Sequence, residues 1–182
     1  MPTPKRPSPR PDGKLDVTVV FLEMTGPPQG IVPPPAGLKL ALLRAEKPTA
    51  SFYRYLYQAV GGPWLWVDRQ RLGDDALAAI LQDERVEISV LYVGGVPAGY
   101  GELDYRKWPE VSLAYFGLVT EFHGRGLGPF FLHRLVQDAW SRRPSKIIVN
   151  TCNLDHPAAL KLYQRIGFRP VATKQVAFDP NL

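Results

Sequence analysis

The chain has 182 residues, of which 45% are hydrophobic and 21% are charged. This length is sufficient to bury one sizeable core, so we expect a single domain over residues 15–182. The formal net charge of +5 is concentrated near the N-terminus, where Lys5, Arg6, Arg10 and Lys14 face only Asp12. These residues are also rich in proline, so we predict a disordered basic tail over residues 1–14 and no nucleic-acid partner.

The single cysteine, Cys152, cannot form an intrachain disulfide, and no apolar signal-peptide region follows the basic N-terminus. The longest apolar runs are far too short to cross a bilayer. We therefore expect a cytoplasmic protein without a membrane partner. A homodimer remains open.

In chain order, strands are expected over residues 15–24 and 38–45, separated by a loop with five prolines and three glycines. The two strands form either a hairpin or separate edge pieces. A helix over residues 51–60 ends at Gly61-Gly62, and Asp74 or Asp75 caps a second helix that runs to about Gln82. Strands over residues 86–93 and 97–105 then form a hairpin across Gly94-Gly95.

The C-terminal half begins with a strand over residues 112–119. A helix follows, because Leu127, Phe131, Leu135 and Ala139 recur every four residues. A buried strand over residues 146–151, a helix over 155–167 and a strand near 171–178 complete the chain. The expected order is β-α-α-β-β-β-α-β-α-β, an α/β fold with a mixed, mostly antiparallel sheet flanked by helices.

Three glycines, Gly124, Gly126 and Gly128, stand at alternate positions between the strand and the helix. Their backbone N–H groups can converge at the positive end of the helix, which suits a phosphate or pyrophosphate. A P-loop would need a lysine after Gly128, and a dinucleotide fingerprint would need a glycine at position 129 and an acidic residue about 20 residues later. The chain meets neither requirement, so we predict a phosphorylated ligand in another kind of loop.

The segment 123–128 resembles motif A of the GNAT superfamily of N-acetyltransferases, Gln/Arg-x-x-Gly-x-Gly/Ala. The segment 155–168, with Leu162-Tyr163 and a terminal Gly167-Phe168, is similar to the second signature of that family. The two motifs span residues 111–168, and a looser match in strand order reaches back to about Leu38. The resemblance implies the GNAT fold and acetyl-CoA as co-substrate. It also implies acetyl transfer to a primary amine of a small molecule or peptide, by direct attack in a ternary complex.

In GNAT enzymes the tyrosine at the place of Tyr163 commonly protonates the departing thiolate of coenzyme A. Helical spacing points Tyr163 inward, and a phenol stays protonated at neutral pH. A core tyrosine bonded to the backbone is the alternative. The residues that the resemblance assigns to coenzyme A are Leu118, Val119, His123, Gly124, Arg125, Gly126, Leu127, Gly128, Asn153 and His156.

The family fold further implies that the strand before the loop bulges away from the next strand, so that pantetheine lies in the opening like an added strand. Gly117 would permit this bulge or a close backbone approach. Backbone N–H groups near residues 116–119 are then candidates to polarise the thioester carbonyl. Two positions depart from the family pattern: His123 replaces Gln or Arg, and His156 replaces Asn. We interpret His156 as a helix-start residue.

For the general base the sequence offers Glu102, which would deprotonate the amine directly or through water, with a plain exposed residue as the alternative. Cys152 lies near His156, but nothing else supports a thiol nucleophile, and a small hydrophobe at a strand end is the better interpretation. The three histidines lack metal-ligand spacing, so we expect no metal.

The first helical region is rich in aromatic residues, namely Phe52, Tyr53, Tyr55, Tyr57, Trp64 and Trp66. The spacing of residues 52 and 55 predicts a core face. Some of these residues are candidates to line a pocket for an aromatic or cationic amine, with core packing as the alternative for each. Asp68 or Glu46 would supply the counter-charge. Two other functions stay open: a catalytically silent acyl-CoA-binding regulatory module, and an interaction protein whose glycine loop is only a tight turn.

Overall fold

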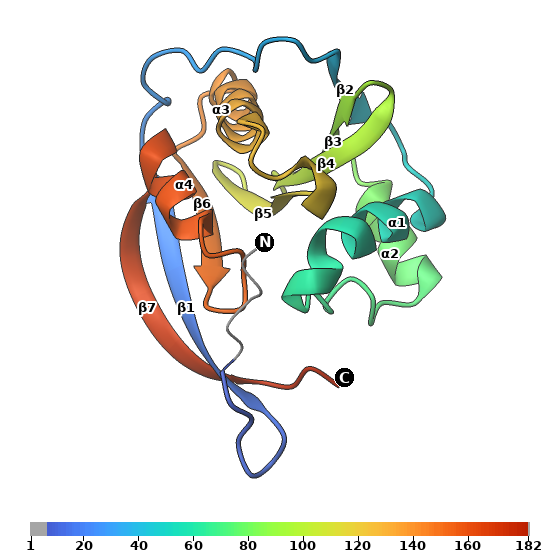
Figure 1. Cartoon of the computed structure of the whole chain (residues 1–182), viewed down its shortest axis with the longest axis vertical. Helices are drawn as coiled ribbons and strands as arrows, with labels where there is room; N and C mark the ends of the chain where they lie inside the picture. The colour runs from blue at the N-terminus through green and yellow to red at the C-terminus, as the bar shows by residue number, and fades with distance from the viewer. Residues whose placement is uncertain (1–6, 182) are drawn as a thin grey trace.

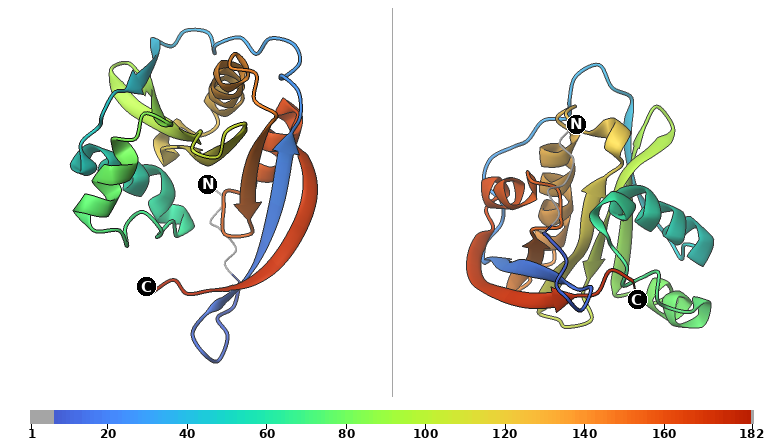
Figure 2. Two further views of the ribbon diagram at one scale, coloured as in Figure 1. Left: turned by 180° about the vertical axis from the view of Figure 1, so that it is seen from behind. Right: turned by 60° about the horizontal axis from the view of Figure 1, so that its bottom comes forward.

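The computed structural model describes residues 7–181 and contains a seven-stranded mixed sheet with helices on both faces (Figures 1 and 2). The α/β class expected from the sequence is confirmed. Within the described residues, no helix is long and apolar enough to cross a bilayer. The strands are β1 (Leu15–Met24), β2 (Leu40–Ala45), β3 (Val86–Val93), β4 (Val96–Asp104), β5 (Glu110–Leu118), β6 (Lys146–Cys152) and β7 (Arg169–Phe178). The helices are α1 (Ala50–Gly61), α2 (Asp74–Leu81), α3 (Leu127–Trp140) and α4 (Ala159–Ile166).

The spatial order of the strands is β2-β3-β4-β5-β6-β1-β7, and only β5 and β6 are parallel. The two N-terminal strands therefore do not form a hairpin. β2 is one edge of the sheet, whereas β1 lies between β6 and β7 and forms a long curved ribbon with β7 (Figure 1). Both strands expected before the first helix, over residues 15–24 and 38–45, are present, although the expected order β-α-α-β-β-β-α-β-α-β counted them as one.

Residues 7–14 fold back onto the start of β1. Pro9 bridges Leu15, and the N–H of Arg10 donates to the carbonyl of Lys14 at 2.7 Å. This turn differs from the disordered tail that the composition led us to expect. The part of that expectation that concerns residues 1–6 lies outside the described residues.

Local signals fixed several element ends. The Thr49 side chain accepts the N–H of Phe52 at 3.3 Å and caps α1. Gly94 and Gly95 both have positive φ, as a tight two-residue hairpin turn requires. The expected cap of the second helix, Asp74 or Asp75, was wrong. α2 begins after Gly73 without a side-chain cap, and α4 begins at Ala159, later than expected.

The late start of α4 has a physical cause in Asp155. Its carboxylate accepts hydrogen bonds from the Thr151 hydroxyl and the Cys152 N–H, both at 2.8 Å, and so stabilises the turn after β6. It therefore does not cap the helix that follows. Gly167 does end α4 with a positive φ of 120°, as expected.

Alternate residues of the central strands point into two cores on opposite faces of the sheet. α1 and α2 cover one core, and α3 and α4 cover the other (Figure 2). The core face of α1 is Tyr53, Leu56, Tyr57 and Val60, whereas Tyr55 is 51% exposed. The expected face through residues 52 and 55 was therefore wrong by one position.

β5 and β6 pair only at their first residues, over Glu110–Ser112 and Lys146–Ile148, and then diverge. A register shift between β4 and β5 leaves Ala114 as an extra residue, so the bulge lies there and not at Gly117. Gly117 permits the other expected feature, a close approach: a Cβ atom there would lie 2.5 Å from Val60 Cγ1. The divergence opens the sheet beside the glycine loop, residues 123–128.

Candidate active site

Two cavities meet where β5 and β6 diverge. The aromatic cavity, of about 340 Å³, is lined by α1, the loop after α1, β5, β6 and the β1–β7 ribbon. The loop cavity, of about 460 Å³, is lined by the end of β5, the glycine loop and α4. The residues that line both cavities are Phe116, Gly117, Leu118, His123, His156, Ala159 and Tyr163. A ligand that occupies one cavity therefore reaches a ligand in the other at these residues.

The glycine loop has the geometry expected for anion binding. Gly124 and Gly126 both have φ of +74°, and Gly126 is the N-cap of the fourteen-residue helix α3. Space above Gly124 is open, because no heavy atom lies within 4 Å of the position of a Cβ. Backbone N–H groups at a helix N-terminus beside open space are suited to phosphate oxygens.

Two cations that the sequence analysis missed line the loop cavity from α4. Lys161 and Arg165 are four residues apart and so lie on one helix face, opposite the glycine loop. Their spacing within the second motif was the available signal. Together with the loop they fit the phosphates of a coenzyme A thioester.

The structure brings most of the expected coenzyme A residues together. Leu118, His123, Gly124, Gly126, Leu127, Gly128 and His156 all line the loop cavity. Val119, Arg125 and Asn153 line neither this cavity nor the aromatic one.

Each of these three residues has another contact. The Val119 N–H donates to the Ala98 carbonyl at 2.9 Å, so it is not directed at a ligand. The exposed Arg125 guanidinium lies over the Phe122 ring at 5.2 Å. Asn153 accepts the Thr18 N–H at 3.0 Å and so ties the loop after β6 to β1.

Tyr163 projects from α4 into the junction of the two cavities. It is 6% exposed and lies between the rings of Phe116 and Phe168, at centroid distances of 6.4 and 5.8 Å. Burial, followed by the negative charge of Asp155, raises the pKa of the Tyr163 phenol above its ordinary value. The hydroxyl therefore stays protonated at neutral pH and can act as a proton donor.

His123 and His156 face each other at the same junction. Their ring centroids are 5.0 Å apart at an interplanar angle of 82°, and the centroid of the Trp64 ring lies 5.1 Å from that of His156. His123 Nε2 is 3.0 Å from the Leu118 carbonyl oxygen, and His156 Nδ1 is 3.1 Å from the Ala158 N. Burial, followed by His123, lowers the pKa of His156. His156 thus precedes α4 as an uncharged side chain of the site.

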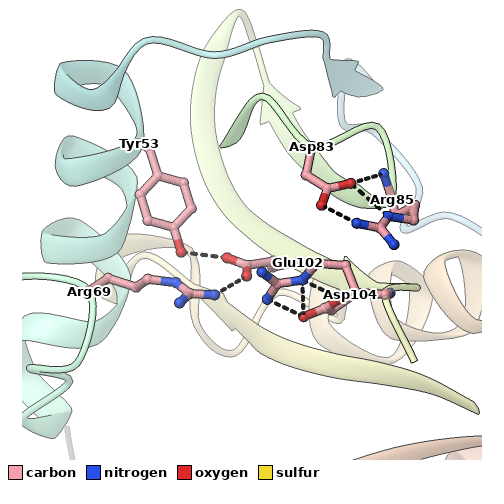
Figure 3. A network of polar contacts seen from close by, with 7 residues as sticks. Tyr53, Arg69, Asp83, Arg85, Glu102 and Asp104 are labelled. Atoms are coloured by element: carbon pink, nitrogen blue, oxygen red, sulfur yellow. Dashed lines mark hydrogen bonds and ion pairs between the residues drawn. The ribbon is translucent and has the colours of Figure 1, made fainter. Parts of the chain in front are cut away.

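Glu102 lies elsewhere. Its side chain is fully buried, accepts the Tyr53 hydroxyl and pairs with Arg69, each at 2.5 Å (Figure 3). It lines neither cavity. The exposed position that the sequence allowed for Glu102 is wrong, because the side chain has no solvent exposure, whereas its role as a base stays a prediction.

The aromatic residues that line the aromatic cavity include Tyr57, Trp64, Trp66 and Tyr115. Tyr115 packs against Tyr57 at 5.1 Å and Trp66 at 5.2 Å between ring centroids, a role of β5 that the sequence analysis missed. Of the two expected counter-charges, Asp68 lines this cavity and Glu46 does not.

Asp155 also lines the aromatic cavity, and its carboxylate accepts the Trp66 indole N–H at 3.3 Å. Burial, followed by Asp155, raises the pKa of the neighbouring Cys152 thiol to about 11. A neutral thiol is a poor nucleophile, which agrees with the interpretation of Cys152 as a packing residue.

Comparison with known proteins agrees with this geometry. Residues 50–168, more than half of the chain, match the acetyltransferase (GNAT) family, and the chain belongs to that family. Among curated proteins, none matches the sequence.

Solved structures share the fold at low sequence identity. A conserved protein of unknown function from Staphylococcus epidermidis is 14% identical with a TM-score of 0.59, over 93% of this chain and 64% of that one. A GCN5-related N-acetyltransferase from Sphaerobacter thermophilus is 16% identical with a TM-score of 0.64, over 91% and 53%. The chain thus spans less than two thirds of the length of these two proteins. An aminoglycoside N-acetyltransferase in complex with CoA is 20% identical with a TM-score of 0.56, over 80% and 97%.

Proposed function

We propose that the chain transfers an acetyl group from acetyl-CoA to a primary amine of a small molecule or peptide, by direct attack in a ternary complex. The observation that carries this proposal is the junction of the two cavities at residues 116–118, His123, His156 and Tyr163. A thioester entering through one cavity meets an amine entering through the other, and no covalent enzyme intermediate is needed. The raised pKa of Cys152 also disfavours a thiol intermediate.

In this proposal the loop cavity holds the phosphates and pantetheine of acetyl-CoA. The N–H groups around Gly124, Gly126 and Gly128 and the cations Lys161 and Arg165 balance the phosphate charge. Pantetheine lies along the free end of β5, where β6 has diverged and leaves backbone groups without a strand partner.

The same geometry supports roles for two groups in the reaction. Tyr163 donates a proton to the departing thiolate, because its phenol is protonated and reaches both cavities. Backbone N–H groups of residues 116–118 are the candidates for stabilising the oxyanion. Val119 is not among them, because its N–H already donates to Ala98.

The amine acceptor occupies the aromatic cavity. Tyr57, Trp64, Trp66 and Tyr115 offer ring faces and edges to the body of the acceptor, and Asp68 offers a negative charge to a protonated amine before it reacts. A cavity of this lining and of about 340 Å³ favours a compact acceptor with an apolar part.

Two measurements test this proposal. Isothermal titration should show acetyl-CoA binding, and bound acetyl-CoA at 100 times its Kd should stabilise the fold by about 2.7 kcal/mol. Release of free CoA should then be followed with a panel of arylalkylamines, amino acids, polyamines, aminoglycosides and peptides. Binding without release for every amine would identify a silent acyl-CoA-binding module instead. Absence of binding would leave only an interaction protein with a tight glycine turn.

A further inference from the structure

The junction of the two cavities contains few side chains that can accept a proton. Of the residues that line both cavities, only His123, His156 and Tyr163 titrate. The pKa of Tyr163 is raised by burial, so its phenol serves as a donor. The Glu102 carboxylate is bonded to Tyr53 and Arg69, and the residue lines neither cavity. Of the side chains that line both cavities, the two histidines are therefore the ones that can accept a proton from an amine at the junction.

Hydrogen bonds determine which nitrogen of each imidazole carries the hydrogen. A carbonyl oxygen only accepts, so His123 Nε2, 3.0 Å from the Leu118 oxygen, carries the hydrogen and Nδ1 keeps its lone pair. His156 is arranged in the opposite way. Its Nδ1 accepts the Ala158 N–H at 3.1 Å, so the neutral ring carries its hydrogen on Nε2. Of the two rings, only His123 presents a basic nitrogen that no described residue occupies.

His156 supports this arrangement as a neutral neighbour. Its ring stands edge to face against His123 and is held on the other side by Trp64. Its pKa is lowered first by burial and then by His123, so His156 favours the uncharged form beside that ring. The pair thus divides into one ring that can donate and one that can accept.

Resting on the proposed function, we propose that His123 is the general base of the transfer. His123 Nδ1 takes a proton from the amine nitrogen as the nitrogen lone pair forms a bond to the thioester carbonyl carbon and the carbonyl π electrons move to oxygen. When these electrons return, the carbon–sulfur bond breaks and the Tyr163 hydroxyl gives its proton to sulfur. His123 then releases its proton to solvent and Tyr163 regains one, so one amine and one thioester yield one amide and one thiol.

Two substitutions at His123 test the proposal. His123→Gln keeps an amide N–H that can donate to the Leu118 carbonyl but has no basic nitrogen. We expect kcat to fall by about 10²- to 10⁴-fold while the Kd of acetyl-CoA changes by less than about twofold. His123→Ala leaves space at the junction, and added imidazole should restore part of the lost rate, which a purely structural role would not allow.

The pH dependence of kcat/KM provides a second readout. A general base must be unprotonated to act, so His123→Gln should change the acidic limb of the wild-type profile and keep only the titration of the amine itself. His156→Asn should retain the limb. His133→Gln is the matched control, because His133 is a histidine of α3 outside both cavities. Other titratable groups lining the two cavities around His123 are Tyr57, Asp68, Tyr115, Cys152, Asp155, His156, Lys161, Tyr163 and Arg165.

A measurement that needs no acceptor completes the test. The chain has three histidines, so their ring nitrogens can be assigned by substitution in ¹⁵N NMR spectra. His123 should carry its hydrogen on Nε2; a hydrogen on Nδ1 would overturn the proposal. Full turnover by His123→Gln, with an unchanged acidic limb, would overturn it as well. Failure of the wild type to turn over any amine would overturn the proposed function, and this inference with it.

Discussion

Arg69 and Glu102 form an ion pair whose carboxylate has no solvent exposure, with Arg69 Nη2 2.5 Å from Glu102 Oε1. The Tyr53 hydroxyl donates to the other carboxylate oxygen (Figure 3). Three segments meet in this contact: α1 through Tyr53, the loop after α1 through Arg69, and β4 through Glu102. The same segments carry Tyr57 and Trp66 of the aromatic cavity. The buried carboxylate therefore acts as a structural link behind the wall of the site.

Arg69→Met should destabilise the protein strongly. The substitution leaves a buried carboxylate without its cation, which costs about 3–5 kcal/mol of unfolding free energy. Urea denaturation monitored by tryptophan fluorescence measures this loss. Arg85→Met is the matched control, because Arg85 pairs with Asp83 at the surface nearby and should change stability little. Equal small losses for the two variants would contradict the structural role of the pair.

Glu102→Gln should separate stability from catalysis. Glutamine keeps the shape of the side chain but removes the charge that Arg69 faces, so we expect a loss of about 1–3 kcal/mol in unfolding free energy. Below the unfolding temperature, kcat and its pH dependence should stay close to those of the wild type, because Glu102 lines neither cavity. A fall in kcat of about 10²-fold at unchanged stability would instead restore Glu102 as the base.

Much of the fold could be predicted because its signals are local. The four-residue spacing from Leu127 to Ala139 and the Gly94-Gly95 turn each define an element without reference to the rest of the chain. The position of β1 could not be predicted in this way. Its pairing with β6 and β7 joins residues far apart in sequence, and the alternation within β1 is the same whichever strand it pairs with.

The same difference between local and long-range signals decides which residues of the candidate site could be predicted. Glycine spacing identified the loop, because positive φ at Gly124 and Gly126 is a local requirement. Glu102 was misplaced, since its burial depends on Arg69, 33 positions earlier in the sequence. The side chains of Lys161, Arg165 and Tyr115 reach the cavities only through the packing of α4 and β5, which no single segment encodes.

Tyr163→Phe should remove the proposed proton donor with little other effect. Phenylalanine retains the ring contacts with Phe116 and Phe168, so the unfolding free energy should change by less than about 1 kcal/mol. We expect kcat to fall by about 10²-fold or more, with a small change in the Kd of acetyl-CoA. Stopped-flow detection of thiol release measures the step. An unchanged kcat would remove Tyr163 from the chemistry.

Gly124→Ala should weaken acetyl-CoA binding through the backbone. Alanine at φ of +74° costs about 1–2 kcal/mol, although its Cβ would meet no heavy atom within 4 Å. To avoid this strain the loop should change conformation, so that its N–H groups no longer converge on the phosphates. Calorimetry should then measure a higher Kd for acetyl-CoA. Gly73→Ala is the control, because its φ is −61° and its Cβ also meets nothing. Equal affinities in the two variants would show that the loop conformation does not determine binding.

Cys152 should behave as a half-buried, slowly reacting thiol. Its pKa in the folded protein is about 11, raised first by burial and then by Asp155, against about 8.5 for a free cysteine. Alkylation by iodoacetamide in the native protein should therefore be slow at pH 8 and increase towards pH 11, whereas the chain unfolded in urea should react with a midpoint near 8.5.

The same difference in pKa between the folded and unfolded states makes the free energy of unfolding depend on pH. The neutral thiol favours the folded state, so this contribution is complete below about pH 8.5 and decreases as the pH rises towards 11. A native midpoint equal to that of the unfolded chain would contradict the burial of Cys152 and its contact with Asp155.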